Sequence, residues 1–185
     1  GALSGGGEEY KIRKKLIEND LVEAILVLPM KMFYTTDISV TLWILNANKK
    51  ERTFEQNNIT KIHRDRTNEI LFMDLRKLGV AFEKKFIQFD TETIEKISST
   101  YHTWQSDKEA YEDIAEYCKS AILSEVIAKD YSLVPSKYIE FVNRDENIDF
   151  DTKMTTLQSE FVELLKEKEK SKQELLTVFK ELGYE

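Results

Sequence analysis

The chain has 185 residues, of which 34 are acidic and 27 are basic, so its formal net charge is -7. This balance excludes a broadly basic surface that would hold nucleic acid by charge alone. Only Gly79 of the six glycines lies between residues 8 and 182, which leaves no glycine-rich phosphate-binding loop in the interior. One cysteine and two histidines exclude a disulfide framework and a thiolate- or histidine-rich site, so no metal is expected.

The first ninety residues have the pattern of an α/β sheet. Helical spacing of apolar residues follows the glycine-rich start and predicts a helix that ends near residues 19–20. Residues 21–28 (LVEAILVL) and 38–45 (ISVTLWIL) predict two buried strands, and residues 69–74 (EILFMD) predict a third. The polar stretch 51–68 between them is expected to be a long loop or an excursion from the sheet.

Beyond Leu78 the sequence is typical of helices. Residues 91–104 place Ile94, Ile97, Tyr101 and Trp104 on one helical face. Further helices are predicted from Ser106 through Tyr117 or Cys118, and over residues 121–129. Extended chain is expected at residues 131–135, because Pro135 disfavours a helical residue before it, and a linker at residues 143–151.

No run of about 18 apolar residues occurs, and the N-terminus has no basic stretch followed by an apolar one. We therefore expect neither a membrane span nor a signal peptide, no membrane partner, and a cytoplasmic location.

The last segment has the a/d spacing of a coiled coil, with apolar residues that alternate in steps of four and three and a polar centre at Lys168 and Ser171. A lone helix of this kind must be covered to be stable, either by this chain or by another, and the pattern leaves both open. The candidate partner-binding residues are Leu157, Phe161, Leu164, Leu175, Val178 and Leu182.

No local spacing indicates a catalytic set. The acidic cluster between Asp107 and Glu116 is explained by a solvated helix face, and His102 and Cys118 by structural roles. Residues 28–37 (LPMKMFYTTD) differ, because two aromatic rings follow a buried strand where a polar connection is usual. Such rings can stack on an extruded nucleobase, or they can cover the core of a buried hairpin turn.

At these residues the chain resembles the modification (methyltransferase) subunit of type I restriction-modification systems, which are adenine-N6 DNA methyltransferases. The likeness rests on a glycine-rich loop, the helix IRKKLIE, a strand that ends in LP, the pair FY before a threonine, and an apolar strand. It continues through ILFMDLRKLG and DYSLVPSKYIEF to the final LGYE. The resemblance implies the C-terminal part of a Rossmann-like methyltransferase sheet followed by a mainly helical C-terminal region.

The resemblance also implies roles. Phe33 occupies the place of an aromatic that packs against the flipped adenine, and its neighbour Tyr34 is the second candidate. The loops that bind S-adenosylmethionine and the adenine amino group are expected before Gly1, since the two prolines here are not adjacent. We therefore expect a C-terminal fragment that has no catalytic residue of its own, binds no cofactor alone and is inactive, although the intact subunit uses S-adenosylmethionine.

The implied partners are the specificity subunit, the restriction subunit and DNA, and the fragment by itself could form a homo-oligomer. The expected division is residues 1–90 for the end of the catalytic domain, 91–142 for a helical region, and 143–185 for a linker and an amphipathic helix. The alternative is a non-enzymatic adaptor with a helical arm, which the lack of a complete active site favours.

Overall fold

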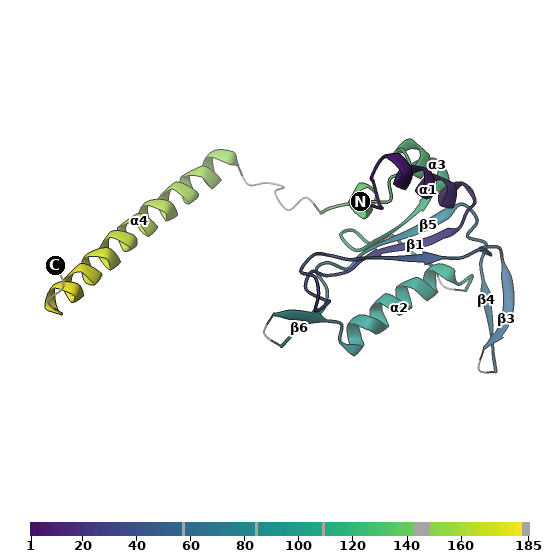
Figure 1. Ribbon diagram of the computed structural model, residues 1–185, viewed down its shortest axis with the longest axis horizontal. Coiled ribbons are helices and arrows are strands. Elements are labelled where there is room, and N and C mark those ends of the chain that lie inside the picture. The colour runs from purple at the N-terminus through teal and green to yellow at the C-terminus, as the bar shows by residue number, and fades with distance from the viewer. Residues whose placement is uncertain (57, 84, 109, 143–148, 183–185) are drawn as a thin grey trace. The chain divides into compact units, whose positions relative to one another are not determined.

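The computed structural model describes residues 1–56, 58–83, 85–108, 110–142 and 149–182, and a four-stranded sheet lies at the centre of its residues 1–142 (Figure 1). The strand order is β2-β1-β5-β8. Strand β1 pairs parallel with β5, whereas β2 and β8 pair antiparallel at the two edges. The bounds are Val22–Val27 for β1, Thr41–Leu45 for β2, Glu69–Asp74 for β5 and Cys118–Ile122 for β8. The prediction of an α/β fold is confirmed.

Helices cover both faces of this sheet (Figure 1). On one face lie α1 (Gly7–Glu18), α3 (Leu123–Ala128) and the short 3₁₀ helix η1 (Pro135–Lys137). The ring of Tyr138 stacks there on that of Phe72, with 4.1 Å between centroids. Helix α2 (Thr91–Gln105) covers the other face with Ile97, Tyr101 and Trp104. Both central strands are therefore buried on two sides, as their continuous apolar runs predict.

Strand β2 differs from the prediction. It begins at Thr41 rather than residue 38, and it is not buried, because Leu42 and Leu45 are 47% and 54% exposed. The reason is its place at the edge of the sheet, where in the described structure it pairs only with β1.

The prediction of a loop over residues 51–68 is wrong. This segment contains the antiparallel hairpin of β3 (Arg52–Gln56) and β4 (Ile59–His63). Asn58 takes a positive φ of 59° at the turn, a conformation that asparagine tolerates better than most residues. The hairpin is largely exposed, so its strands lack the apolar alternation that identifies a strand in sequence.

The helix predicted from Ser106 through Tyr117 or Cys118 is also wrong. Ser106 instead ends α2, since its backbone N–H donates to the carbonyl of His102. Cys118 begins β8, which buries Cys118 and Ala121 against β5. Pairing with a strand more than forty residues earlier thus overrides local helix propensity. The helix predicted over residues 121–129 begins at Leu123, after this strand.

The chain divides into two compact units, Gly1–Val142 and Asn143–Glu185. The first includes residues 91–142, which supply β8 to the sheet as well as helices. It also contains the small hairpin β6 (Val80–Phe82) and β7 (Phe86–Gln88). In the second unit the structure describes α4 (Phe150–Glu181), whereas most of the expected linker lies outside the described residues. None of the described helices combines the length and apolar character that membrane crossing requires.

Candidate functional site at the carboxyl edge of the sheet

The loops after β1 and β5 emerge at the same edge of the sheet, because these two strands run parallel. The backbone N–H of Leu75, just after β5, donates to the carbonyl of Val27 at 2.9 Å. Residues 28–40 and 75–79 therefore leave the sheet side by side. In α/β sheets this carboxyl edge is the usual place for a ligand.

Phe33 and Tyr34 lie in a tight turn within the first of these loops. The N–H of Thr36 donates to the carbonyl of Phe33 at 3.3 Å. The Phe33 side chain is 42% exposed and that of Tyr34 is 74% exposed, so neither ring is enclosed in the core. This exposure contradicts the alternative in which both rings cover the core, and it leaves part of each ring accessible to a planar ligand.

A cavity of about 510 Å³ opens beside this turn. Its lining comes from the two loops and from β7, and it contains both apolar and cationic side chains. The lining residues are Pro29, Met30, Lys31, Ser39, Arg76, Lys77, Leu78, Gly79 and Ile87. Lys77 forms an ion pair with Glu116 at 3.2 Å. Arg76 binds the carboxylate of Asp74, with 2.5 Å between Nη2 and Oδ2. Burial tends to raise the pKa of Asp74, but hydrogen bonds from Arg76 hold it below the ordinary value.

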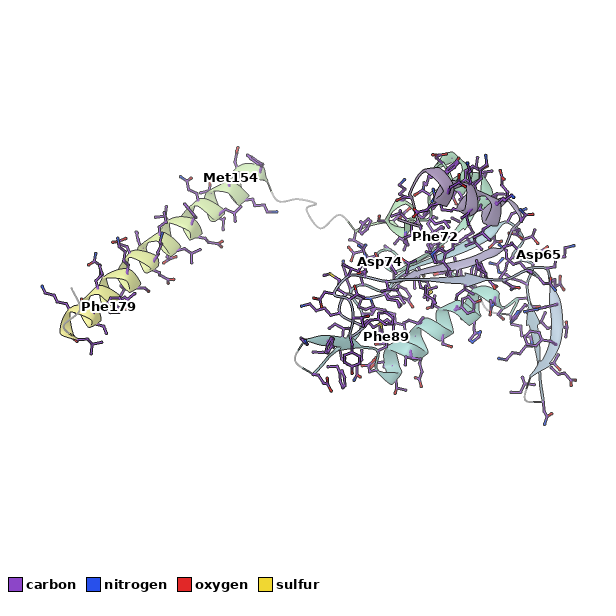
Figure 2. The ribbon with its side chains drawn as sticks, viewed as in Figure 1. Asp65, Phe72, Asp74, Phe89, Met154 and Phe179 are labelled. Carbon is purple, nitrogen blue, oxygen red and sulfur yellow. The ribbon has the colours of Figure 1, made fainter. Side chains whose placement is uncertain are left out.

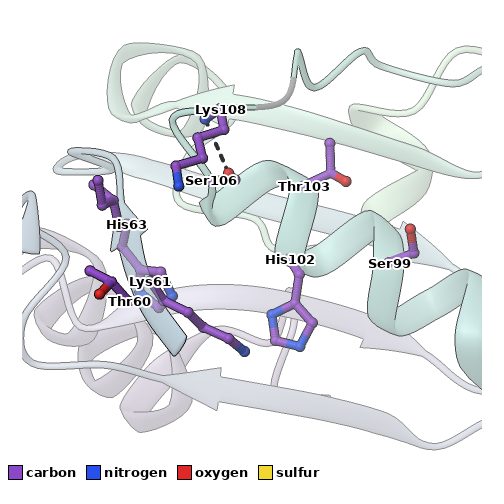
Figure 3. A pocket seen from close by; sticks show the side chains of 9 residues that line it. Thr60, Lys61, His63, Ser99, His102, Thr103, Ser106 and Lys108 are labelled. Atoms are coloured by element: carbon purple, nitrogen blue, oxygen red, sulfur yellow. Dashed lines mark hydrogen bonds between the residues drawn. The ribbon is translucent and has the colours of Figure 1, made fainter. Parts of the chain in front are cut away.

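A second cleft of about 300 Å³ lies between β4 and α2 (Figure 3). Its lining consists of Thr60, Lys61, Ile62, His63, Ser99, His102, Thr103, Ser106 and Lys108. Two lysines, two histidines and four residues with hydroxyl groups line this space, and no carboxylate is among its described lining residues, so its chemistry suits an anion. Burial, together with the nearby charge of Arg66, lowers the pKa of His63. This cleft has no signal in the sequence, where residues 51–68, which include its β4 wall, are expected to be a loop.

The two hollows lie at opposite ends of the parallel strands. The cleft wall is joined to the amino ends of β1 and β5, since Gln105 donates to the Glu23 carboxylate at 3.1 Å and Arg64 pairs with Glu69 at 2.7 Å. The turn of Phe33 follows the carboxyl end of β1. Of the two hollows, only the cavity beside the turn of Phe33 lies at the carboxyl edge, which is where such sheets usually bind a ligand.

Comparison with known proteins assigns the fold. The family model described as N-6 DNA Methylase matches residues 1–147. The chain belongs to the N-6 DNA methylase family. The predicted resemblance is thereby confirmed at the level of the family.

Curated relatives of this N-6 DNA methylase chain are type I restriction enzyme methylase subunits. The HindI methylase subunit of Haemophilus influenzae is 36% identical over 182 residues, covering 96% of this chain and 37% of the relative. The MjaIX methylase subunit of Methanocaldococcus jannaschii is 28% identical over 186 residues, covering 100% of this chain and 31% of the relative. The chain thus spans about a third of the length of these relatives.

A crystal structure of the type I restriction-modification system methyltransferase subunit from Streptococcus thermophilus has a similar fold over the aligned part of the chain. It aligns with a TM-score of 0.58 at 26% identity and covers 76% of this chain and 25% of that chain. The match supports the α/β assignment independently of the sequence motifs.

The lining of the cavity at the carboxyl edge does not fit S-adenosylmethionine. The cofactor carries a positively charged sulfonium and ribose hydroxyls, which an acidic side chain usually binds at the end of a strand in such folds. The lining of this cavity includes, among the described residues, the cations Lys31, Arg76 and Lys77 and no carboxylate. Among the described residues, no three histidine, cysteine, aspartate or glutamate side chains are placed to hold a metal ion either.

The acidic cluster, His102 and Cys118, for which the sequence predicts structural roles, make contacts within the fold of this methylase-family chain. Asp113 of the acidic cluster accepts hydrogen bonds from Lys119 Nζ at 2.9 Å and from the N–H of Ser120 at 2.8 Å, which secures the start of β8. His102 contacts Gln105 at 3.3 Å. Cys118 is buried beside Tyr111, and burial raises its pKa.

Helix α4 carries the predicted coiled-coil positions. Asp149 caps its start by accepting from the N–H of Thr152 at 3.2 Å. The stripe consists of Leu157, Phe161, Leu164, Leu175 and Val178, and it ends at the capping residue Leu182. These side chains are between 47% and 65% exposed in the described structure. We call these six residues the α4 stripe.

Proposed function

We propose that this chain is part of a DNA adenine-N6 methyltransferase subunit of a type I restriction-modification system, and that Phe33 stacks on the flipped adenine. The exposed ring of Phe33 at the carboxyl edge of the sheet carries this proposal. Every base has a π-face, and stacking on an aromatic side chain contributes about 1 to 3 kcal/mol. Tyr34 borders the same turn and is the second stacking candidate. The family match favours this function over the adaptor alternative.

In this proposal the intact protein supplies S-adenosylmethionine, which provides the methyl group for adenine N6. In this proposal, residues of this chain bind neither the cofactor nor the amino group, and the chain alone is inactive. Its own contribution is to hold the extruded base at the end of β1, where stacking offsets the free energy lost on unpairing. The intact subunit works in the cytoplasm with DNA.

The experiment compares intact subunits with and without the stacking ring. Phe33→Ala is expected to reduce methyl transfer at least tenfold, since about 1.4 kcal/mol of lost stacking corresponds to a factor of ten. Phe33→Trp keeps a planar ring and is expected to retain activity. Unchanged methyl transfer by Phe33→Ala would remove the proposed role of this ring, and methyl transfer by residues 1–185 alone would contradict the proposed inactivity of the chain.

We also propose that the tail, residues 143–185, docks on helices of the specificity subunit through the α4 stripe, and that the restriction subunit joins this complex. Residues 1–90 would then belong to the catalytic domain and residues 91–142 to the region that supports it. The support is the exposed apolar stripe, because an unpaired amphipathic helix gains most of its stability from a partner. In the isolated chain, β2 offers an exposed edge at which a second copy could pair.

A further inference from the structure

The loop of Phe33 is tied to the β6–β7 hairpin. The backbone N–H of Ile87, in β7, donates to the carbonyl of Lys31 at 3.0 Å. Among the described residues, this is the backbone hydrogen bond that joins positions 29–39 to another part of the chain. Lys31 holds a positive φ of 59°, which a residue with a long side chain adopts only where its surroundings maintain it.

A ring contact joins the same two segments. Phe86 of β7 meets Tyr34 edge to face, with 4.7 Å between ring centroids and 74° between their planes. Tyr34 is otherwise largely exposed, so Phe86 supplies much of the packing that restrains its ring. Because Phe33 precedes Tyr34 directly, a restraint on Tyr34 also limits where the Phe33 ring can lie.

The hairpin itself is anchored to the core at both ends. Leu78 before β6 and Phe89 after β7 pack against the cluster that contains Trp104, and Figure 2 shows Phe89 beside α2. Asp90 then caps α2 by accepting from the N–H of Thr93 at 2.8 Å. The β6–β7 hairpin is therefore held in place by the core, whereas the loop of Phe33 is mostly exposed.

We infer that Phe86 is a positioning residue for adenine stacking: its ring and the adjacent Ile87 hydrogen bond hold the turn of Phe33 in the orientation that receives the flipped base. This inference rests on the proposed function, since it assigns Phe86 a role in presenting Phe33. Phe86 acts through Tyr34 and has no direct contact with the base in this scheme.

The test uses the intact methyltransferase with its specificity subunit and a duplex that carries 2-aminopurine in place of the target adenine. The variants are Phe33→Ala, Phe86→Ala and Phe86→Tyr, with Val80→Ala as the matched control in the same hairpin. Val80 is exposed and lines no part of the cavity beside the turn. Methyl transfer is measured on the unmodified duplex, and 2-aminopurine fluorescence reports stacking of the extruded base.

We expect Phe86→Ala to lower kcat about tenfold to a hundredfold, because a displacement of about 1 Å at a reacting group has effects of this size. KM for DNA stays unchanged, 2-aminopurine fluorescence rises because stacking no longer quenches it, and Phe86→Tyr restores both signals. Val80→Ala behaves like the unchanged protein.

The outcomes separate this inference from the proposed function. If Phe33→Ala loses activity and stacking whereas Phe86→Ala keeps both, the positioning role is overturned and the stacking role stands. If Phe33→Ala keeps both, the stacking role itself fails and the positioning role falls with it. A loss in Val80→Ala equal to that in Phe86→Ala, or no rescue by Phe86→Tyr, would show general damage to the hairpin and overturn the inference.

Discussion

Glu23 of β1 and Arg66, shortly before β5, form an ion pair in the interior, with 3.1 Å between Oε1 and Nη2. Their side chains are 2% and 0% exposed. Gln105, at the end of α2, donates to the same carboxylate oxygen at 3.1 Å. The pair thus connects the amino end of the sheet with the helix that covers it.

Breaking this pair from one side is expected to destabilise the first unit strongly. Arg66→Met should lower the free energy of unfolding by about 3 to 5 kcal/mol, because it leaves the Glu23 carboxylate buried without its cation. Urea unfolding followed by tryptophan fluorescence measures this, since Trp43 and the buried Trp104 both lie in this unit. Glu23→Gln combined with Arg66→Met should cost less than the sum of the single changes, and strict additivity would contradict a direct interaction.

The same pair predicts a dependence on pH. Burial tends to raise the pKa of Glu23, but hydrogen bonds from Gln105 and the charge of Arg66 bring it below its ordinary value of 4.5. A carboxyl group whose pKa is lowered by folding stabilises the fold at pH values above its ordinary pKa. This contribution is lost as the pH falls through the lowered pKa. The free energy of unfolding should therefore fall as the pH drops below 4.5, and less steeply in Glu23→Gln. Equal slopes in the two proteins would show that Glu23 is not responsible.

Gly79→Ala is expected to destabilise the chain by about 1 to 3 kcal/mol. Gly79 has a φ of +97°, and a Cβ atom there would lie 2.8 Å from the carbonyl oxygen of Gln88 and from Cγ2 of Ile87. Gly6→Ala is the matched control, because a Cβ atom at Gly6 meets nothing within 4 Å. Comparison of the two thermal midpoints measures the difference, and equal midpoints would refute the predicted clash.

The thiol of Cys118 is expected to react slowly in the native chain. Cys118 is 1% exposed, and burial raises the pKa of its thiol. Since the thiolate is the reactive form, a thiol-specific chromogenic disulfide should react on the time scale of unfolding. The same chain in urea, where Cys118 is accessible, is the control, and rapid modification without denaturant would contradict this burial.

Leu164→Asp in α4 is expected to weaken assembly with the specificity subunit about tenfold or more, since a charge would replace an apolar side chain in the interface. The stability of residues 1–142 should stay unchanged, as measured by tryptophan fluorescence. Lys166→Asp is the control, because it lies roughly 200° around the helix from Leu164. Equal losses of assembly and of stability in Leu164→Asp would favour packing of α4 on its own chain.

Much of the sheet could be predicted from sequence. The apolar run of residues 21–28 is long enough to identify β1 as a strand buried on both faces. The pattern does not explain Glu23 within this run, whose partner in the interior is Arg66. Helix α2 follows from the spacing of Ile97, Tyr101 and Trp104. Phe33 and Tyr34 stand out in the sequence because aromatic side chains are unusual after such a strand, and the structure shows them exposed.

Other features have no local signal. The hairpin β3–β4 is mostly exposed, so its residues show no apolar alternation. The contact of Phe86 with Tyr34 joins segments about fifty residues apart, and no spacing rule brings them together. The anion-compatible cleft is lined by residues of β4 and by residues of α2 and just after it, and these two elements are far apart in the chain.

Local apolar periodicity is therefore enough to predict the elements that it buries, and the sequence motifs are enough to predict the family of the chain. Which segments pair depends on contacts between residues that are far apart in the chain. Residues 118–122 became β8 instead of helix because β5 offered a partner strand, and Arg66 is tolerated in the interior because Glu23 lies across from it. The physical reason is that backbone pairing and charge compensation depend on groups far apart in the chain, whereas apolar periodicity is a local property.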